Sequence, residues 1–263
     1  MRGMQGVWLG FSLLFFINCA ENADVSHRVW DHGGIVRADT TQKALTLVFT
    51  GGDYADGGRV ILETLGRHQI KGAFFFTGDF YRNPKFSTLI FDLKNQGHYL
   101  GAHSDQHLLY CDWVNRDSTL VSRAEFIEDV ENNYAEMERY GILKQDAPWF
   151  LPAYEWYNDT IAAWTEQLGL TLVNFSPGTY SNADYTTPDM GDRYLDSETI
   201  FQRILTYESR NGLNGFLLLT HIGTDPSRTD KFYHRLEELI VELQERGYRF
   251  ISLREALGEV KQE

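Results

Sequence analysis

Cysteine is almost absent from this sequence: only Cys19 and Cys111 occur among its 263 residues. Cys19 lies at the edge of an N-terminal apolar stretch that we interpret as a signal, so the mature fold has at most one free thiol. An internal disulfide, and with it a small disulfide-stapled scaffold, is therefore excluded. We expect Cys111 to pack as a small apolar side chain rather than to act as a nucleophile.

Positive charge is also scarce. The chain carries 24 Lys and Arg against 37 Asp and Glu, a formal net charge of −13 at pH 7. Proteins that bind nucleic acid gather Lys and Arg against the phosphates, so nucleic acid is excluded as a partner. The same balance argues against binding to an acidic membrane surface. A low-complexity linker is lacking too, which favours a single domain over residues 24–263.

No apolar run is long enough to cross a membrane comfortably. The best candidate, residues 3–17, follows one positive charge at Arg2 and precedes a run of small and polar residues. A spanning helix needs about 20 apolar residues, so residues 1–23 are typical of a secretory signal. We expect export to the periplasm, the cell surface or the medium. Cys19 stands where a bacterial lipoprotein is acylated; a lipid there, the one membrane attachment considered, and simple cleavage nearby are equal alternatives.

From residue 43 onward the sequence repeats an apolar strand, a polar loop, an amphipathic helix and a glycine. Most of the apolar runs are nearly continuous, as expected where both faces of a parallel strand are covered. Alternating strands and helices indicate βαβ units, and about seven strands favour an irregular (β/α) barrel over an open doubly wound sheet. The expected strands are Ala44–Thr50, Gly72–Thr77, Tyr99–Ala102, Pro148–Pro152, Leu170–Phe175, Gly215–Thr220 and Tyr248–Ser252.

Three of the intervening helices have a capping residue at the start and a glycine at the end. Capping side chains accept hydrogen bonds from the first free N–H groups of a helix, and glycine adopts the backbone conformation that ends one. The expected pairs are Ser122, in a capping box with Glu125, and Gly141; Asn158 or Asp159 and Gly169; and Thr229 or Asp230 and Gly247.

Polar residues collect after the expected strands, at their carboxyl ends, where (β/α) barrels assemble their active sites. Asp53 follows the first strand and His103 the third. Tyr154 and Glu155 follow the fourth, and His221 follows the sixth. These loops are far apart in sequence, and the barrel brings them to one face. We therefore expect a functional site there.

His103 and His107 form the sharpest local pattern. Two histidines four residues apart lie on one face of a helical turn, so both imidazoles can reach one divalent ion. Asp53 is the best candidate for a third ligand. The alternative is that both are ordinary surface or core histidines, and the position of His103 at a strand end favours the metal site. His98, before the third strand, is at the wrong end for chemistry and is interpreted as structural.

Five segments occur in an order and spacing that is more specific than any one of them. They are Leu47–Asp53, Gly72–Gly78, His103–His107, Phe150–Tyr154 and Leu217–His221. Together they resemble the NodB-type polysaccharide deacetylases, also called carbohydrate esterase family 4, over residues 43–255. The corresponding family segments are a strand ending T-F-D-D-G, a strand A-T-F-F-x-x-G, the motif H-[ST]-x-x-H, an R-x-P-Y type motif and a strand ending L-x-x-x-H.

The resemblance implies a distorted barrel and a hydrolase that removes acetyl groups from glycans. It implies a divalent transition metal, most often zinc, on Asp53, His103 and His107, which polarises the acetyl carbonyl and activates a water. A carboxylate base takes the proton of that water. The resemblance further implies a proton donor at His221 and a backbone N–H donor to the oxyanion at Tyr154.

The chain departs from the family pattern at the end of the first strand. Thr50–Gly51–Gly52 stands where the family has its adjacent pair of carboxylates. Asp53 must then be displaced by a local bulge to reach the metal, and it cannot easily be a separate base as well. Asp56 is the alternative carboxylate for either role, or an exposed turn residue.

Two further family features are missing. Phe150 replaces the arginine that orients the base, and the acidic fourth motif is not recognisable in Asn174–Gly178. Glu155 is a candidate for the missing carboxylate or for a contact to sugar. Asp225 either orients His221 or forms a turn before Pro226.

Two functions are therefore open: an active glycan deacetylase, and a carbohydrate-binding protein that has kept the barrel but lost catalysis. The missing carboxylates favour the second. We favour the enzyme, because a binding module has no need for His221 aimed at the same pocket. Polymers of N-acetylglucosamine, peptidoglycan, acetylated xylan and surface glycans all fit as substrates. The loop aromatics expected either to stack on sugar rings or to pack internally are Tyr110, Trp113, Trp156, Tyr157 and Tyr185.

Overall fold

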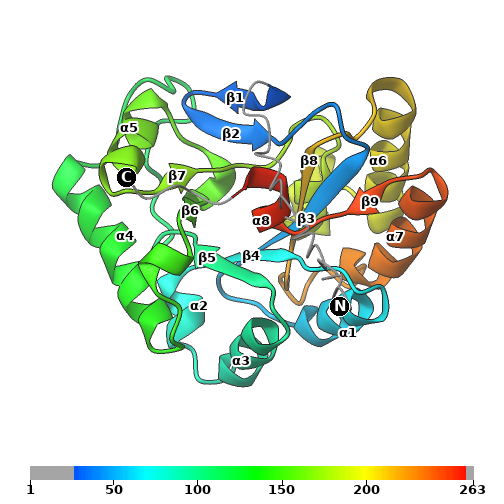
Figure 1. Ribbon diagram of the computed structural model, residues 1–263, viewed down its shortest axis with the longest axis horizontal. Coiled ribbons are helices and arrows are strands. Elements are labelled where there is room, and N and C mark those ends of the chain that lie inside the picture. Colours follow the sequence, from blue (N-terminus) through cyan, green and yellow to red (C-terminus); the bar gives the residue numbers. More distant parts are fainter. Residues whose placement is uncertain (1–26, 259–263) are drawn as a thin grey trace, which may run out of the picture.

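The computed structural model describes residues 27–258, so the expected signal at residues 1–23, and Cys19 within it, lie outside the described range. Figure 1 shows the strands gathered at the centre of the molecule, with helices arranged around them. Between residues 27 and 258 no helix is long and apolar enough to span a membrane.

The strands form one sheet in the order β1-β2-β8-β3-β4-β5-β6-β7, and β9 pairs with β3. The ladder from β8 through β3 to β7 is parallel throughout, and β9 is also parallel to β3. The prediction of an irregular barrel with about seven parallel strands is thereby confirmed. The strands are β1 (Val29–Asp31), β2 (Gly34–Arg37), β3 (Ala44–Gly51), β4 (Ala73–Phe76), β5 (Tyr99–Ala102), β6 (Trp149–Phe150), β7 (Thr171–Leu172), β8 (Phe216–His221) and β9 (Arg249–Phe250).

β3 is the central strand, and every one of its residues is buried. Leu45 pairs with Phe216 of β8 on one edge and with Phe250 of β9 on the other. Phe49 stacks on Phe74 of the neighbouring β4 with ring centroids 4.8 Å apart. Burying one such side chain contributes roughly 1.5–3 kcal/mol, which fixes the strand and so the positions of the residues that follow it.

The short hairpin of β1 and β2 was not expected from the sequence, and it joins the two ends of the sheet. Arg37 of β2 pairs with Phe216 of β8, and Ile35 forms a bridge to Val173 just after β7. The Asn174 N–H donates to the Ile35 carbonyl at 2.8 Å. The irregular barrel is therefore closed by β2, which runs antiparallel to β8 and forms a parallel bridge to Val173.

Two of the three predicted helix starts are confirmed. Ser122 and Glu125 form the capping box of α4, and the Asn158 side chain caps α5. The third was wrong: Asp230 accepts instead from the Ser197 N–H at 2.5 Å. The helices are α1 (Gly58–Arg67), α2 (Gly78–Arg82), α3 (Ser87–Asn95), α4 (Arg123–Glu138), α5 (Asp159–Gln167), α6 (Ser197–Asn211), α7 (Leu236–Glu245, after the 3₁₀ turn η6, Phe232–Arg235) and α8 (Leu253–Leu257).

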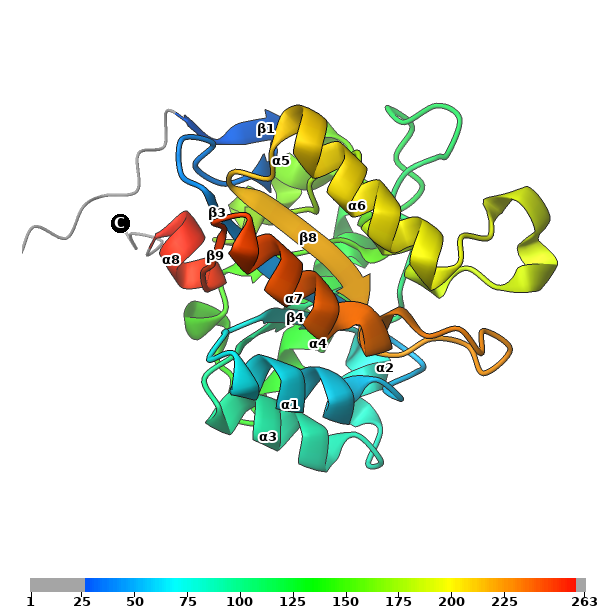
Figure 2. The same cartoon turned by 90° about the vertical axis from the view of Figure 1, so that its right-hand side faces the viewer.

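The loops that follow the strands project from one end of the barrel. Figure 2 shows the segment before α6 and the loop after β8 extending side by side beyond the head of the β8 arrow. The segment before α6 contains two 3₁₀ turns, η4 (Ser181–Tyr185) and η5 (Pro188–Arg193). This end of the molecule holds the largest concentration of polar side chains singled out from the sequence.

Candidate active site

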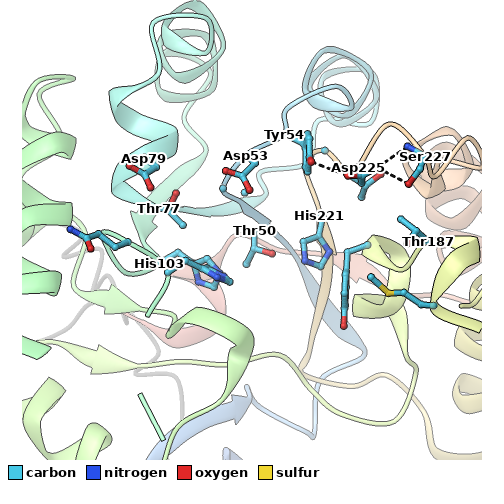
Figure 3. A pocket seen from close by; sticks show the side chains of 18 of the residues that line it. Thr50, Asp53, Tyr54, Thr77, Asp79, His103, Thr187, His221, Asp225 and Ser227 are labelled. Atoms are coloured by element: carbon cyan, nitrogen blue, oxygen red, sulfur yellow. Dashed lines mark hydrogen bonds between the residues drawn. The ribbon is translucent and has the colours of Figure 1, made fainter. Parts of the chain in front are cut away.

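A cavity of about 570 Å³ opens among the carboxyl ends of β3, β4, β5 and β8. Asp53, His103, His107 and His221 all line it. Tyr154 and Glu155, which the strand-end argument placed at the same face, are not among its lining residues. Figure 3 shows His103 and His221 on opposite sides of Thr50, with Asp53 nearby. The segment from Tyr185 to Met190 completes one wall.

His103 is buried and held in one tautomer. Its Nδ1 lies 2.9 Å from the Leu151 carbonyl oxygen, and because a carbonyl can only accept, Nδ1 carries the hydrogen. The backbone N–H of His103 donates to Asn133 Oδ1 at 2.9 Å. Burial lowers the pKa of His103 well below its usual value. The ring is therefore neutral, with the lone pair of Nε2 free, which is the state a metal ligand needs.

His107 approaches His103, but the expected helical turn between them was wrong. Ser104 and His107 have φ values of 72° and 55°, in the left-handed region. Side chains shape this loop instead: Ser104 Oγ accepts from the Leu108 N–H at 3.0 Å, and Asp129 accepts from the Gln106 N–H at 3.0 Å. The imidazole centroids of His103 and His107 are nevertheless 5.2 Å apart.

Both histidines suit a transition metal, but the third ligand is not brought against them. Burial, with His221 close by, lowers the pKa of His107 to about 4, so two neutral imidazoles face the cavity. The Asp53 side chain lines the same cavity and is exposed. Within residues 27–258 no three His, Cys, Asp or Glu side chains lie close enough together to hold an ion. The ligand role of Asp53 thus stays a prediction.

Asp56, the alternative carboxylate, is committed to holding two loops together. It accepts from the Thr224 N–H and from the Tyr233 hydroxyl, both at 2.9 Å. It also pairs with Lys231 at 3.0 Å. These partners lower its pKa despite burial. Asp56 therefore has the contacts of a structural residue.

Tyr154 and Glu155 form a strained corner after β6. Their φ values are 59° and 53°, and few residues other than glycine adopt such angles without a reason. The Glu155 carbonyl accepts from Asn174 Nδ2 at 2.8 Å, which helps to fix the corner. Glu155 Oε1 lies 3.7 Å from His103 Nε2, with its side chain 11% exposed. Burial raises the pKa of Glu155 to about 7, while the charge of His221 opposes the rise.

His221 has a carboxylate partner that the sequence did not reveal. Asp184, from η4, lies 2.6 Å from His221 Nδ1 and accepts from the His221 N–H at 2.9 Å. Burial alone would lower the pKa of His221, but Asp184 outweighs it, so the pKa lies above the usual value. Asp225, the residue considered for this role, instead accepts from Tyr54 and Ser227. Asp184 stands in no recognisable motif, 37 residues before its partner.

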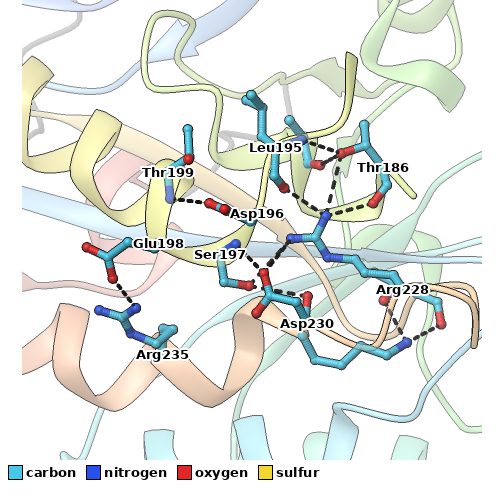
Figure 4. A network of polar contacts seen from close by, with 12 residues as sticks. Thr186, Leu195, Asp196, Ser197, Glu198, Thr199, Arg228, Asp230 and Arg235 are labelled. Atoms are coloured by element: carbon cyan, nitrogen blue, oxygen red, sulfur yellow. Dashed lines mark hydrogen bonds and ion pairs between the residues drawn. The ribbon is translucent and has the colours of Figure 1, made fainter. Parts of the chain in front are cut away.

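Arg228 holds the wall of the cavity that carries Asp184. Its guanidinium is fully buried and donates to the Thr186 carbonyl at 2.7 Å and the Leu195 carbonyl at 2.9 Å. Figure 4 shows these bonds beside the contact of Asp230 with Ser197 at the start of α6. The segment between η4 and α6 is therefore tied to the loop after β8 at both of its ends.

The loop aromatics divide into core and surface residues. Tyr110 and Tyr157 are fully buried, whereas Trp113 is 55% and Tyr185 44% exposed. Trp113 stacks on Trp156, which is partly buried, with centroids 5.6 Å apart. Trp113 also meets Tyr154 edge-on at 5.6 Å, and Tyr154 in turn lies 4.3 Å from the His107 ring. An exposed aromatic row thus leads from His107 outward.

The sequence profile described as polysaccharide deacetylase matches residues 37–173, which is more than half of the chain. The chain belongs to this family. A peptidoglycan-N-acetylmuramic acid deacetylase, PdaA of Bacillus subtilis, is 25% identical over 84% of the chain and 74% of its own length. A peptidoglycan-N-acetylglucosamine deacetylase, PgdA of Listeria monocytogenes, is 24% identical over 83% of the chain. The chain spans only 40% of that relative's length.

Solved structures of family members have the same fold. The structure of PdaA from Bacillus subtilis, a family 4 carbohydrate esterase, aligns with a TM-score of 0.66 at 20% identity, covering 86% of this chain and 85% of that one. A family 4 pseudoenzyme from Bacillus anthracis aligns with a TM-score of 0.67 at 18% identity, covering 88% of this chain and 70% of that one. An acetyl xylan esterase from Clostridium thermocellum, solved with cobalt, aligns with a TM-score of 0.62 at 19% identity, covering 81% of this chain and 89% of that one.

Proposed function

We propose that this family member is an exported, metal-dependent hydrolase that removes acetyl groups from a polysaccharide or a surface glycan. The observation that carries the proposal is the pair of His221 and Asp184, 2.6 Å apart, on the cavity that also holds His103 and His107. A carboxylate that keeps an imidazole protonated prepares it to donate a proton. A protein that only binds sugar gains nothing from such a pair.

The metal that fits best is a divalent transition ion, with zinc first, because neutral imidazoles and one carboxylate are its usual donors. His103, His107 and Asp53 are the residues that would hold it. When bound, such an ion polarises the acetyl carbonyl and lowers the pKa of a water. The locked tautomer of His103 supports this assignment, since the Leu151 carbonyl fixes which nitrogen is free.

The remaining steps belong to side chains and backbone of this chain. Glu155 accepts the proton of the attacking water, a role open to it because Asp53 serves the metal. Tyr154 offers its backbone N–H to the oxyanion that develops on the acetyl group. His221 then gives its proton to the leaving amine or alcohol while Asp184 stabilises the charged ring.

The favoured substrate is an N-acetylated glycan such as peptidoglycan, which the relatives in Bacillus and Listeria are named for. The exposed Trp113 and Tyr185 stack on the apolar faces of its sugar rings. Such a substrate lies outside the cytoplasm, in agreement with a signal at residues 1–23 and a single mature domain at 24–263. A lipid on Cys19 remains an equal alternative to simple cleavage.

The second candidate is a carbohydrate-binding protein without catalysis. Thr50–Gly51–Gly52 and Phe150 stand where the family pattern has carboxylates and an arginine, and one protein of this fold is described as a pseudoenzyme. We favour the enzyme because His221, the proton donor of our proposal, is hydrogen-bonded to the Asp184 carboxylate.

Acetate release tests the proposal. The purified protein is incubated with peptidoglycan, chitin oligomers and acetylated xylan, first with a chelator and then with added zinc or cobalt. We expect release that stops on chelation and returns with metal. His221→Ala should abolish turnover while sugar affinity remains, and His234→Ala, an exposed histidine outside the cavity, serves as the matched control. Sugar binding without acetate release on any substrate would establish the binding protein instead.

A further inference from the structure

Thr50 occupies the centre of the candidate site. It is the penultimate residue of β3 and pairs in register with His221 of β8. Its side chain lines the cavity although only 1% of the residue is exposed. Figure 3 shows it between His103 and His221. The hydroxyl therefore sits in the floor of the cavity, next to the groups expected to do the chemistry.

The hydroxyl of Thr50 has no hydrogen-bond partner in the described part of the chain. This is unusual for a buried polar group, because an unmade bond costs free energy. Thr46, four residues earlier on the same strand, shows the ordinary case: its Oγ1 donates to the Ile251 carbonyl at 3.0 Å. Burial in β3 alone does not deprive a threonine of partners, so the unpaired hydroxyl is particular to the cavity.

Neither Gly51, the last residue of β3, nor Gly52 just after it supplies a polar side chain at this place. A Cβ at Gly51 would lie 2.6 Å from Ile222 Cγ2 and 3.0 Å from Phe76, so position 51 admits no side chain. Gly52 has room, since a Cβ there would meet Thr77 only at 3.7 Å, but it brings no polar group. Thr50 is thus the one polar side chain that the strand itself sets in the floor.

We propose that the Thr50 hydroxyl binds an oxygen at the reaction centre, either the carbonyl oxygen of the acetyl group or the attacking water. The inference rests on the proposed function and adds a residue to it. A hydroxyl both donates and accepts, so it orients either oxygen. The hydroxyl is far too weak a base to take the proton, which leaves that step to Glu155, the carboxylate proposed above.

The test compares three variants. Thr50→Val keeps the shape and removes the hydroxyl, Thr50→Ser keeps the hydroxyl, and Thr46→Val removes a hydroxyl that has its partner. We expect Thr50→Val to lower kcat/KM at least about tenfold, the worth of one hydrogen bond, with Thr50→Ser within about threefold of the wild type. The unfolding midpoint of Thr50→Val should equal or exceed that of the wild type, whereas Thr46→Val should lower it and leave kcat/KM unchanged.

The kinetic constants and inhibition by the product acetate show which of the two oxygens the Thr50 hydroxyl binds. If Thr50 binds the acetyl oxygen, Thr50→Val weakens inhibition by acetate in step with activity. If it orients the water, kcat falls and the affinity for acetate does not change.

Two results would overturn the inference. One is a Thr50→Val variant as active as Thr50→Ser; the other is a loss of thermal stability in Thr50→Val as large as in Thr46→Val, the mark of a structural hydroxyl. Absence of acetate release from the wild type would instead defeat the proposed function, and without turnover there is no attacking water to orient. Only binding of the acetyl carbonyl oxygen is then left, and it is decided by titrating both Thr50 variants with sodium acetate: weaker binding by Thr50→Val supports it and equal binding overturns it.

Discussion

The two sides of the cavity differ in how completely their polar groups are paired. On the β8 side, Asp184 makes two hydrogen bonds to His221, and Arg228 fixes the segment that carries Asp184. On the β3 side, the Asp53 carboxylate has no hydrogen-bond or ion-pair partner within residues 27–258, and the Thr50 hydroxyl has none either. The polar groups on the β8 side are therefore already held by other parts of the protein, whereas those on the β3 side can bind a ligand without breaking an internal contact.

This difference gives a rule for what each substitution changes. Groups that are paired within the protein support both stability and geometry, so their loss lowers both. Groups without internal partners cost little or nothing in stability when removed, and their loss appears in activity alone. The predictions below test that rule, starting with the largest expected effect.

Asp53→Asn should reduce acetate release on the order of 1,000-fold, because the amide is a poor metal ligand. The thermal midpoint without added metal should change little, since the carboxylate has no partner to lose. Asp56→Asn is the matched control: it removes a carboxylate with three partners, so it should lower the midpoint and spare most of the activity. Metal affinity measured by calorimetry should fall in Asp53→Asn only.

Asp184→Asn should lower kcat about 100-fold, because the neutral amide no longer stabilises the charged imidazole. Asp184 raises the pKa of His221 above 6.5, so its removal lowers that pKa. Since the proton donor acts below its pKa, the alkaline limb of the kcat profile should move to lower pH.

The raised pKa of His221 also makes the contribution of the Asp184–His221 pair to folding stability depend on pH. A raised histidine pKa contributes stability that is complete below the unfolded value of about 6.5 and is lost as the pH rises through the folded value. Asp184→Asn should therefore destabilise the protein more at acid than at alkaline pH. Asp225→Asn removes the carboxylate that binds Tyr54 and Ser227, and an equal shift of the alkaline limb in that variant would contradict the assignment.

Arg228→Met should lower the free energy of unfolding by roughly 2 kcal/mol, because the Thr186 and Leu195 carbonyls lose their buried donor. Chemical denaturation measures this directly. Arg203→Met provides the comparison, since Arg203 is exposed and lies over the Tyr180 ring. We expect a cost within about 1 kcal/mol there.

Trp113→Ala should raise KM about fivefold on a glycan polymer and leave kcat unchanged, since one stacked ring contributes about 1 kcal/mol. Trp30→Ala removes another exposed tryptophan, 48% exposed on β1 and outside the cavity, and should leave both constants unchanged. A fall in kcat for Trp113→Ala would show that the ring acts through Tyr154 on the chemistry instead.

The barrel could be predicted from the sequence because the patterns that indicate its strands and helices lie within short stretches of neighbouring residues. The buried run of β3 and the caps at Ser122 and Asn158 depend on neighbouring residues and appeared where expected. The hairpin of β1 and β2 was missed because β1 is exposed and has no apolar pattern. The start predicted at Asp230 failed because a contact with Ser197, distant in sequence, takes that carboxylate.

The residues of the candidate site also differ in whether the sequence could reveal them. His103, His107 and His221 could be found because each follows a recognisable strand, and the barrel brings strand ends together. Asp184 could not, because its link to His221 exists only once the segment before α6 has folded onto β8. The left-handed turn at His107 was equally hidden, since spacing alone cannot tell a helical turn from a loop.

The open space above Gly52 has a practical consequence. A cysteine there would stand at the edge of the cavity, where Thr77 is the nearest neighbour of its Cβ at 3.7 Å. Cys111, the one other thiol between residues 24 and 263, is buried, and burial raises its pKa. In a chain produced from residue 24 onward, which lacks Cys19, Gly52→Cys would therefore accept a fluorescent label selectively. Light emitted from that single point would report the arrival of a glycan before any bond is broken.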